Sequence, residues 1–385
     1  MLIGFTVENF KSFYGETSLS MVASGDKEHR EFNVIPTGQT DLLKNILIYG
    51  ANASGKSNLV YALHYMKTMV SSAFDVQTEH IKNCRPFSFR DDSEKLPTKF
   101  EISFLLDDIV YDYGFEILYG QISREYLYKK DKRRTLVFER TAPGFESIRI
   151  TPDMADVEPL KKNVRPDVLF LTWAAYANNA LAINIVDWIS KKLIIFGFNG
   201  YKSSLEYAGD FYQNFIQKAD SDILDMKWDN KGKISSSHSL YDDNWAELKI
   251  IDVPFKEYSS DGTKQMLDLA PVFYKALEGS AVIIIDELDL HLHPALVRHL
   301  ISLINSTLHN RNNAQLICTT HDVLLLDEDI RRDQIWFVDK DEHSVSTLYA
   351  LSDFKDVRKN SDILKRYLLG VYGAIPNLNR GGGDE

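Results

Sequence analysis

Residues 50–57 read Gly-Ala-Asn-Ala-Ser-Gly-Lys-Ser, which is the complete GxxxxGK[ST] pattern of a phosphate-binding loop. An apolar run, Asn45–Tyr49, precedes the loop, and apolar residues recur behind it at helical spacing, at Leu59, Ala62, Leu63 and Met66. In a strand–loop–helix unit, the backbone N–H groups of the loop and the N-terminus of the helix can surround a polyphosphate. The sequence therefore predicts a nucleoside triphosphate site.

Residue types within this loop match the chemistry of such a site. Lys56 is expected to reach the β- and γ-phosphates, and the Ser57 hydroxyl is expected to ligate Mg²⁺. A glycine-rich turn that binds nothing is the alternative, but the flanking strand and helix argue against it. ATP and Mg²⁺ are therefore the expected cofactors, and the other expected contacts of the loop are Gly50, Asn52, Ser54, Gly55 and Asn58.

An acidic motif late in the chain supplies the second half of the expected site. Residues 282–285 are Val-Ile-Ile-Ile, and Asp286 and Glu287 follow them directly. A buried parallel strand would deliver Asp286 to the sheet edge beside the phosphate loop, where it can hold the Mg²⁺ shell. Glu287 would then polarise an attacking water as general base. A strand that simply ends in solvated acids is the weaker alternative in a chain that also carries a phosphate loop.

Two shorter segments are assigned from their positions. His321 follows a predicted buried strand at residues 316–320. A histidine at a strand end is usually structural, but this strand should lie beside that of Asp286, so we expect His321 to sense the γ-phosphate. A hydroxyl and a glycine at a helix start can form an anion site, and they occur together in Ser260, Asp261, Gly262 and Thr263. Taken alone, these four residues also fit an ordinary N-cap, but their place one helix before Asp286 favours the anion site.

Bulk composition narrows the possible partners and compartment. The 385 residues carry a formal net charge of −11, which argues against a uniformly basic surface. The densest basic cluster, residues 129–134, is better explained as a solvated hairpin tip than as a nucleic-acid contact. Cys84 and Cys318 lie far apart in the sequence and have no metal-ligand spacing, which favours a reducing compartment. The N-terminus lacks the pattern of a signal peptide. No apolar run approaches the ~20 residues that span a bilayer, so we expect a cytoplasmic protein without a membrane partner.

Periodicity suggests how the chain is organised. Four β-rich runs predict an antiparallel meander, at residues 99–106, 109–118, 123–128 and 135–140. Residues 155–225 are expected to be mostly helical, with the clearest helical period from Trp173 to Ile194. We expect a polar turn at Asp229–Lys233 and a disordered tail around the glycines at 381–383. Four regions follow: an N-terminal ATPase lobe (1–95), an antiparallel β subdomain (96–145), a helical insertion (146–245) and a C-terminal ATPase lobe (246–385).

These elements, in this order, resemble the ABC-type ATPases of the SMC, RecF and OLD group. The closer resemblance is to the stand-alone AAA-type ATP-binding proteins of bacterial anti-phage (abortive infection) operons. It covers both ends of the chain well and residues 120–250 only loosely. The matching segments are residues 9–13, 50–57, 260–263, 286–294, 320–321, 333–337 and 367–376.

The resemblance implies an α/β fold, namely an ABC-type P-loop NTPase head with an antiparallel β subdomain and a helical insertion. It implies that two heads bind two ATP molecules between them, with residues 50–57 of one subunit facing residues 260–263 of the other. Asp289 would then cross the dimer interface. Asp261 stands where transporter subunits carry the first of two glycines, which speaks against a transporter. The residues that the resemblance places near adenine and ribose are Asn9, Phe10 and Lys11.

Three functional classes stay open. The first is a regulatory ATPase that senses a phage-derived trigger or nucleic acid and controls a separate, nuclease-like effector; the resemblance favours it. A RecF-like DNA-repair ATPase and an ATP-dependent assembly scaffold are the others. A nuclease within the chain, suggested by the acids of Asp339-Lys340-Asp341, would need more sequence than follows His321. His291-Leu292-His293 lacks a third metal ligand nearby and is better explained as a loop at the dimer interface.

Overall fold

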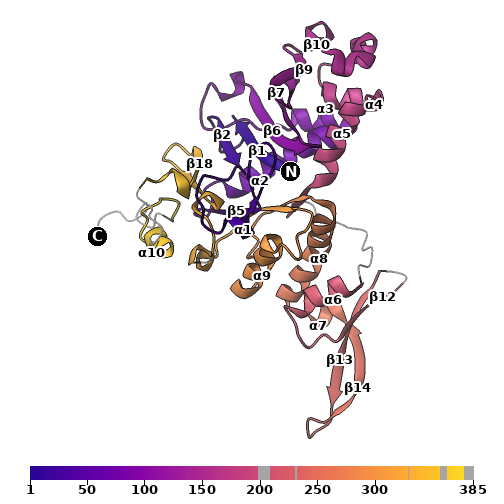
Figure 1. The fold of residues 1–385 in the computed structure, drawn as a ribbon, viewed down its shortest axis with the longest axis vertical. Helices are drawn as coiled ribbons and strands as arrows, with labels where there is room; N and C mark the ends of the chain where they lie inside the picture. Colours follow the sequence, from indigo (N-terminus) through magenta and orange to yellow (C-terminus); the bar gives the residue numbers. More distant parts are fainter. Residues whose placement is uncertain (198–208, 230–231, 328, 356–361, 377–385) are drawn as a thin grey trace.

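The computed structural model describes residues 1–197, 209–229, 232–327, 329–355 and 362–376 (Figure 1). Two large sheets and the helices packed on them form the body, and a β-ribbon projects from one end. The polar turn expected at Asp229–Lys233 lies partly, and the glycine tail wholly, outside the described residues. Within the described residues no helix is both long enough and apolar enough to cross a membrane.

A six-stranded sheet carries the expected nucleotide elements. Its first five strands run parallel and the sixth is antiparallel. In spatial order the strands are β11 (Leu193–Phe196), β15 (Val282–Ile285), β16 (Gln315–Thr319), β5 (Asn45–Tyr49), β17 (Ile335–Lys340) and β18 (Ser346–Ala350). Because the carboxyl ends of parallel strands meet at one edge, the segments after β5, β15 and β16 come together there.

The second sheet is antiparallel and has seven strands. In spatial order they are β10 (Ile148–Ile150), β9 (Arg134–Arg140), β8 (Gln121–Lys130), β7 (Ile109–Leu118), β6 (Thr98–Leu106), β1 (Leu2–Glu8) and β2 (Thr17–Ser20). The meander predicted from the alternating runs is confirmed as β6 to β9. Strand β1 pairs with β6, so the sheet crosses the boundary expected between residues 95 and 96.

Helix α2 (Lys56–Ser71) lies in the core between these sheets (Figure 1). Its buried residues pack with the antiparallel sheet and with one face of the parallel sheet. The opposite face of the parallel sheet packs against α8 (Asp261–Gly279) and α9 (Pro294–Asn305). The remaining helices are α1 (Arg30–Asn33), α3 (Phe74–Lys82), α4 (Phe170–Tyr176), α5 (Ala180–Asp187), α6 (Gly209–Gln217), α7 (Phe255–Tyr258) and α10 (Ile363–Leu368).

The helical stretch expected to reach Ile194 ends earlier, and this prediction was wrong. A short π-helical segment, Trp188–Lys192, follows α5, and Leu193–Phe196 is strand β11, which pairs in parallel with β15. An apolar run of this length fits a buried strand as well as the end of a helix, so periodicity alone could not separate them. The region expected to be mostly helical therefore supplies an edge strand of the central sheet.

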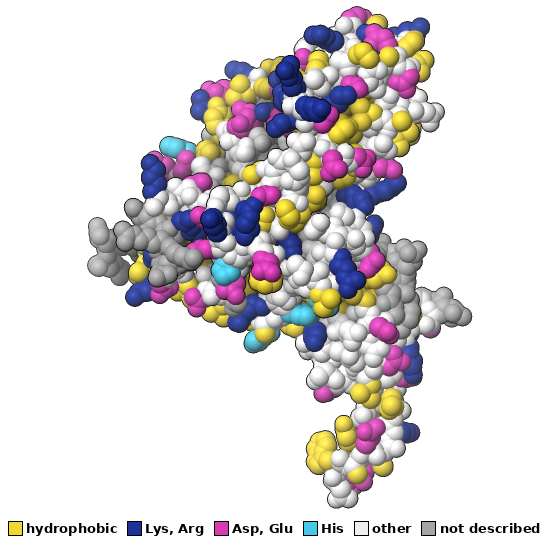
Figure 2. All heavy atoms as spheres, in the orientation of Figure 1, with side chains coloured by type: hydrophobic (Ala, Val, Ile, Leu, Met, Phe, Trp, Pro, Cys, Tyr) yellow, Lys and Arg dark blue, Asp and Glu magenta, His cyan; other side chains and the backbone are white. Residues whose placement is uncertain are grey.

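Strands β13 (Ile234–Tyr241) and β14 (Glu247–Pro254) form the projecting ribbon (Figure 1). A third strand, β12 (Asp225–Trp228), pairs with β13 near its base, and a small pair, β3 (Val34–Ile35) with β4 (Leu42–Leu43), lies in the body. Large apolar side chains are exposed along the ribbon and at its tip (Figure 2), namely Tyr241, Trp245, Leu248 and Ile250.

Candidate nucleotide-binding site

The phosphate loop is held in a tight conformation by glycines. Gly55 has a φ of 118° and caps α2, in the left-handed region that favours glycine. A Cβ atom at Gly50 would overlap the carbonyl oxygen of Val338, and one at Gly55 would overlap the hydroxyl of Ser346. Both glycines are therefore required by the close approach of β17 and β18 to the loop.

Lys56 lies across the mouth of the loop. Its Nζ donates to the carbonyl oxygens of Gly50 at 2.7 Å and Ala51 at 3.1 Å. Burial lowers the pKa of Lys56, and the nearby carboxylates of Asp286 and Glu287 act in the opposite direction. The ammonium is thus held by carbonyl groups that polyphosphate oxygens could replace.

A cavity of about 360 Å³ opens at this loop. The hydroxyl of Ser54 is buried in the loop without a hydrogen-bond partner, which fits a site built for a polar ligand. The residues that line the cavity are Asn52, Ala53, Ser54, Gly55, Lys56, Ser57, Asn58, Glu287, His321 and Lys340. The structure thus brings most of the loop residues expected to bind nucleotide together with Glu287 and His321, and it adds Lys340, which sequence reasoning did not assign to this site.

Asp286 and Glu287 are positioned by one buried hydroxyl. Thr319, at the end of β16, donates from Oγ1 to Asp286 Oδ1 at 2.6 Å. The same oxygen accepts the backbone N–H of Glu287 at 2.7 Å. Glu287 has a φ of 52°, so this hydrogen bond supports a backbone conformation that is unusual for a side-chain-bearing residue. Sequence reasoning missed Thr319, whose signal is its position directly before the Thr320-His321 pair.

The carboxylate of Asp289 is engaged within its own subunit. Both of its oxygens accept the backbone N–H of His321, each at 3.1 Å. This hydrogen bond ties the loop after β15 to the loop after β16, while the His321 side chain itself is exposed beside the cavity. In this structure Asp289 therefore positions His321, and its expected place across a dimer interface stays a prediction.

The Ser260–Thr263 segment begins α8 and does not line the cavity. The Ser260 hydroxyl accepts the backbone N–H of Thr263 at 3.1 Å, as a helix N-cap does. Ser260 and Asp261 are exposed, and a Cβ at Gly262 would lie 2.8 Å from the carbonyl oxygen of His291. Ser260 and Asp261 are therefore open to another molecule and do not contact the cavity of their own chain, whereas Thr263 is buried.

Asn9 and Phe10 are not placed to meet adenine. Both side chains are almost fully buried, and that of Asn9 bonds the backbone of Ser93, Leu96 and Phe87. Phe10 packs against aromatic rings of α2 and β6. Lys11 places its Nζ 3.5 Å from the ring centroid of Tyr61. None of the three lines the cavity, which corrects the direct contacts expected for Asn9 and Phe10.

The acids of Asp339-Lys340-Asp341 are used by local structure. Asp339 accepts the backbone N–H groups of Lys340 and Ala374, and Asp341 accepts those of His343 and Val345. Across the part of the chain that the structure describes, no group of three or more His, Cys, Asp or Glu residues could hold a metal ion. Asp339 and Asp341 therefore serve as hydrogen-bond acceptors for nearby backbone N–H groups.

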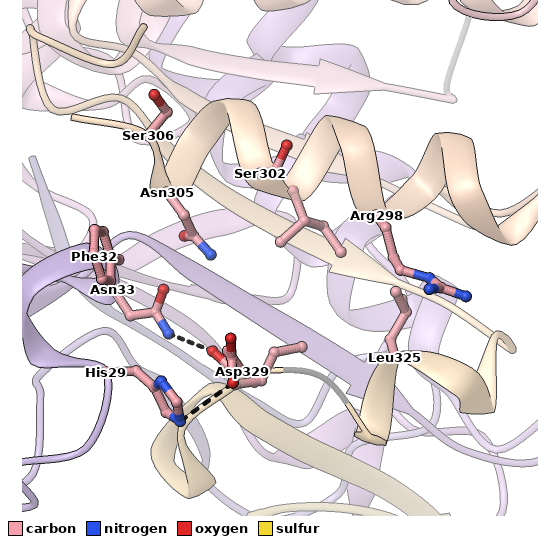
Figure 3. Close-up of a pocket in the computed structure, with 11 residues that line it drawn as sticks. His29, Phe32, Asn33, Arg298, Ser302, Asn305, Ser306, Leu325 and Asp329 are labelled. Carbon is pink, nitrogen blue, oxygen red and sulfur yellow. Dashed lines mark hydrogen bonds and ion pairs between the residues drawn. The ribbon is translucent and has the colours of Figure 1, made fainter. Parts of the chain in front are cut away.

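A second pocket, of about 340 Å³, lies between α1 and α9, away from the phosphate loop (Figure 3). Asp329 is tied to one wall, since its carbonyl oxygen accepts from Asn33 Nδ2 at 2.9 Å and its carboxylate lies 3.8 Å from His29 Nε2. Arg298 and Ser302 of α9 line the opposite wall. None of the residues expected to bind nucleotide faces this pocket.

The chain is similar to a known protein family and to a solved structure. A family model described as "AAA domain, putative AbiEii toxin, Type IV TA system" matches residues 46–327. The chain belongs to this family. Among solved structures, the SmcHead bound to the C-winged helix domain of ScpA is similar over 91% of this chain and 97% of that chain, at 16% identity and a TM-score of 0.41. No curated protein matches the chain.

Membership of this family gives the chain an AAA domain, which the model matches over residues 46–327. The matched range includes Lys56, Asp286 and His321, which the structure brings to one sheet edge. Lys340 lies outside the matched range. The predicted P-loop fold class is therefore confirmed, with its antiparallel sheet.

Replacing Thr319 tests how the acidic pair is held. Thr319→Val keeps the side-chain shape but leaves the Glu287 N–H and the Asp286 carboxylate without this partner, so it should lower the free energy of unfolding by about 1–3 kcal/mol. Thr319→Ser, which keeps the hydroxyl, should cost clearly less. Urea unfolding of both variants measures the difference; equal stabilities would show that the hydroxyl does not position the pair.

Proposed function

We propose that this protein is an ATP-binding and ATP-hydrolysing regulatory ATPase of a bacterial anti-phage defence system. ATP would drive head-to-tail association of two subunits, and this association would control a separate, nuclease-like effector. The observation that carries the proposal is the meeting of the phosphate loop, Glu287 and His321 around one cavity. The description of the family, which names a toxin of an abortive-infection type, supports the defence setting.

The side chains present fit Mg²⁺ and a triphosphate. Ser57 and Asp286 would hold the metal, Asp286 through water, and bound Mg²⁺ would supply neutralisation of phosphate charge. Lys56 would exchange its two carbonyl partners for phosphate oxygens. Glu287 would accept the proton of an attacking water, and His321 would contact the terminal phosphate.

A second subunit would complete the site. Ser260 and Asp261 are exposed and do not line the cavity of their own chain, so a partner copy could present them to the terminal phosphate. The β13–β14 ribbon, which carries exposed apolar residues, projects away from β5 and α2, between which the phosphate loop lies (Figure 1). Neither the ribbon nor the hairpin tip between β8 and β9 lines the cavity. We therefore propose that the ATPase lobes, 1–95 and 246–385, do the chemistry. The intervening regions, together with β14, which completes the ribbon at the start of the C-terminal lobe, would recognise the trigger or effector.

Glu287→Gln should retain ATP binding, lose turnover by about 100-fold or more and accumulate an ATP-bound dimer or higher oligomer. The amide keeps the shape of the carboxylate but cannot accept a proton from water. Steady-state phosphate release and light scattering with and without ATP measure the two effects. Lys56→Ala is the binding-deficient control. Turnover near the wild-type rate would show that Glu287 is not the general base.

The composite-site model is tested at Asp261. Gly262→Arg should abolish ATP-driven association. However, a Cβ at this position would lie too close to the His291 carbonyl oxygen of its own chain, so the variant would also disturb the subunit itself. Asp261→Arg avoids this, because the side chain is exposed. It should leave calorimetric ATP binding intact and remove both association and hydrolysis, whereas the same charge change at exposed Asp243 should remove neither.

Mixing the Asp261→Arg and Lys56→Ala proteins gives the complementary readout. Each mixed dimer would contain at most one composite site with a sound loop and a sound α8 start, so partial turnover should return. Normal hydrolysis by monomeric Asp261→Arg would contradict the composite site and favour a single-subunit P-loop enzyme.

Trigger or effector recognition by the intervening regions is probed at the β8–β9 tip. Lys129 and Arg134 pair with Asp153 and Asp112, so the reversal is confined to Lys130, Lys132 and Arg133, which are exposed. Replacing these three with Glu should reduce phage protection and leave ATP turnover unchanged, because none of them lines the cavity. A variant with Gln at the same three positions has the side-chain shape of Glu without its negative charge, so it shows whether charge or shape causes the effect. Unchanged protection would contradict a recognition role and support the interpretation of this cluster as a solvated hairpin tip.

A further inference from the structure

The β17–β18 hairpin is fastened to the back of the phosphate loop. Ser346 Oγ donates to the carbonyl of Ser54 at 2.5 Å, and Ser346 N–H donates to the carbonyl of Ser12 at 2.7 Å. The Ser12 hydroxyl in turn accepts from Asn58 Nδ2 at 2.8 Å. These contacts involve Ser54 before Gly55 and Asn58 after it, so they fix the position of the hairpin relative to the loop.

Strand alternation turns Lys340 toward the loop. Asp339 points the other way, since its Oδ2 accepts the backbone N–H of Ala374 at 3.2 Å. Successive side chains of a strand alternate between faces, and residues directly opposite on antiparallel strands share a face. Lys340 stands opposite Ser346 in the β17–β18 register, so it shares the face that meets Ser54. Its place in the cavity wall agrees with this orientation.

The order of strands fixes the side from which Lys340 approaches. Strand β17 lies on one side of β5, and β16 and β15, which deliver His321 and Glu287, lie on the other. Lys340 is half-buried in the cavity wall and no carboxylate lies within ion-pair distance of it among the described residues. The cavity thus has an ammonium group on the wall away from the proposed hydrolytic residues.

We propose that Lys340 is a second phosphate-binding cation, which contacts the polyphosphate on the side away from Glu287 and His321. This inference rests on the proposed ATP site and deepens it. Because Lys340 stands on the wall away from Glu287 and His321, we assign it to the binding of nucleoside di- and triphosphates alike. Lys56 and Lys340 then bracket the phosphate chain, one from the loop and one from the hairpin.

Calorimetry with ATP and with ADP tests this role. Lys340→Gln should weaken the binding affinity for both nucleotides by about tenfold or more, which is the size expected for a lost hydrogen bond to a charged group. Lys340→Arg, which keeps the charge, should restore most of the affinity. Lys355→Gln makes the same change at an exposed lysine of the same C-terminal segment and should bind as the wild type. The ATP concentration that gives half-maximal turnover should rise for Lys340→Gln in proportion to its loss of ATP affinity.

The outcomes separate this inference from the proposed function. If wild type binds ATP, Lys56→Ala does not, and Lys340→Gln binds both nucleotides as wild type does, the role of Lys340 is overturned while the ATP site stands. Loss of saturated turnover with unchanged affinity also overturns it, because Lys340 would then act in hydrolysis. If wild type binds neither nucleotide, the ATP site itself fails. Urea unfolding confirms that Lys340→Gln is folded.

Discussion

The parallel register of β15, β16 and β5 is the constraint on which the site depends. Ile285 stands opposite Cys318, and Thr319 stands opposite Ile48, so Asp286, Thr319 and the phosphate loop reach the same sheet edge. A slip of one residue would turn the Thr319 hydroxyl to the other face, because side chains alternate along a strand. Apolar residues bury both faces of these strands, one against α2 and the other against α8 and α9, and this two-sided burial holds the register.

Burial of α2 between two sheets explains which expected residues serve the site and which serve the core. The helix starts at the phosphate loop, so its first turn faces the cavity while its later turns are enclosed. Phe10 belongs to the enclosed part, where it stacks on Tyr61 at 6.0 Å and meets Phe100 at 5.1 Å between centroids. The segment that the resemblance placed near adenine therefore fastens the antiparallel sheet to α2 and, through Ser12, to the loop.

Sequence patterns predicted the parts of the site whose chemistry is local. The loop at residues 50–57 and the strand that ends just before Asp286 combine composition, spacing and flanking periodicity, so the sheet edge could be expected from them. Strand β11 could not be separated from a helix, because Leu193–Phe196 is a short apolar run whose state depends on pairing with β15. Lys340 also could not be assigned, since its approach to the loop depends on β17 pairing with a strand almost 300 residues earlier in the chain.

The charged side chains around the phosphate loop are already arranged to receive the proposed ligand. Burial lowers the pKa of Lys56, while the carboxylates near it act in the opposite direction, and two carbonyl oxygens accept hydrogen bonds from its Nζ. Replacing those carbonyls by phosphate oxygens exchanges neutral acceptors for charged ones, which strengthens each hydrogen bond. Asp286 is held by Thr319, and Asp289 is held by the His321 N–H, so neither carboxylate needs to move toward Lys56. A metal-bound triphosphate would therefore enter an arrangement whose acids are already fixed, and the chief rearrangement would be that of the Lys56 side chain.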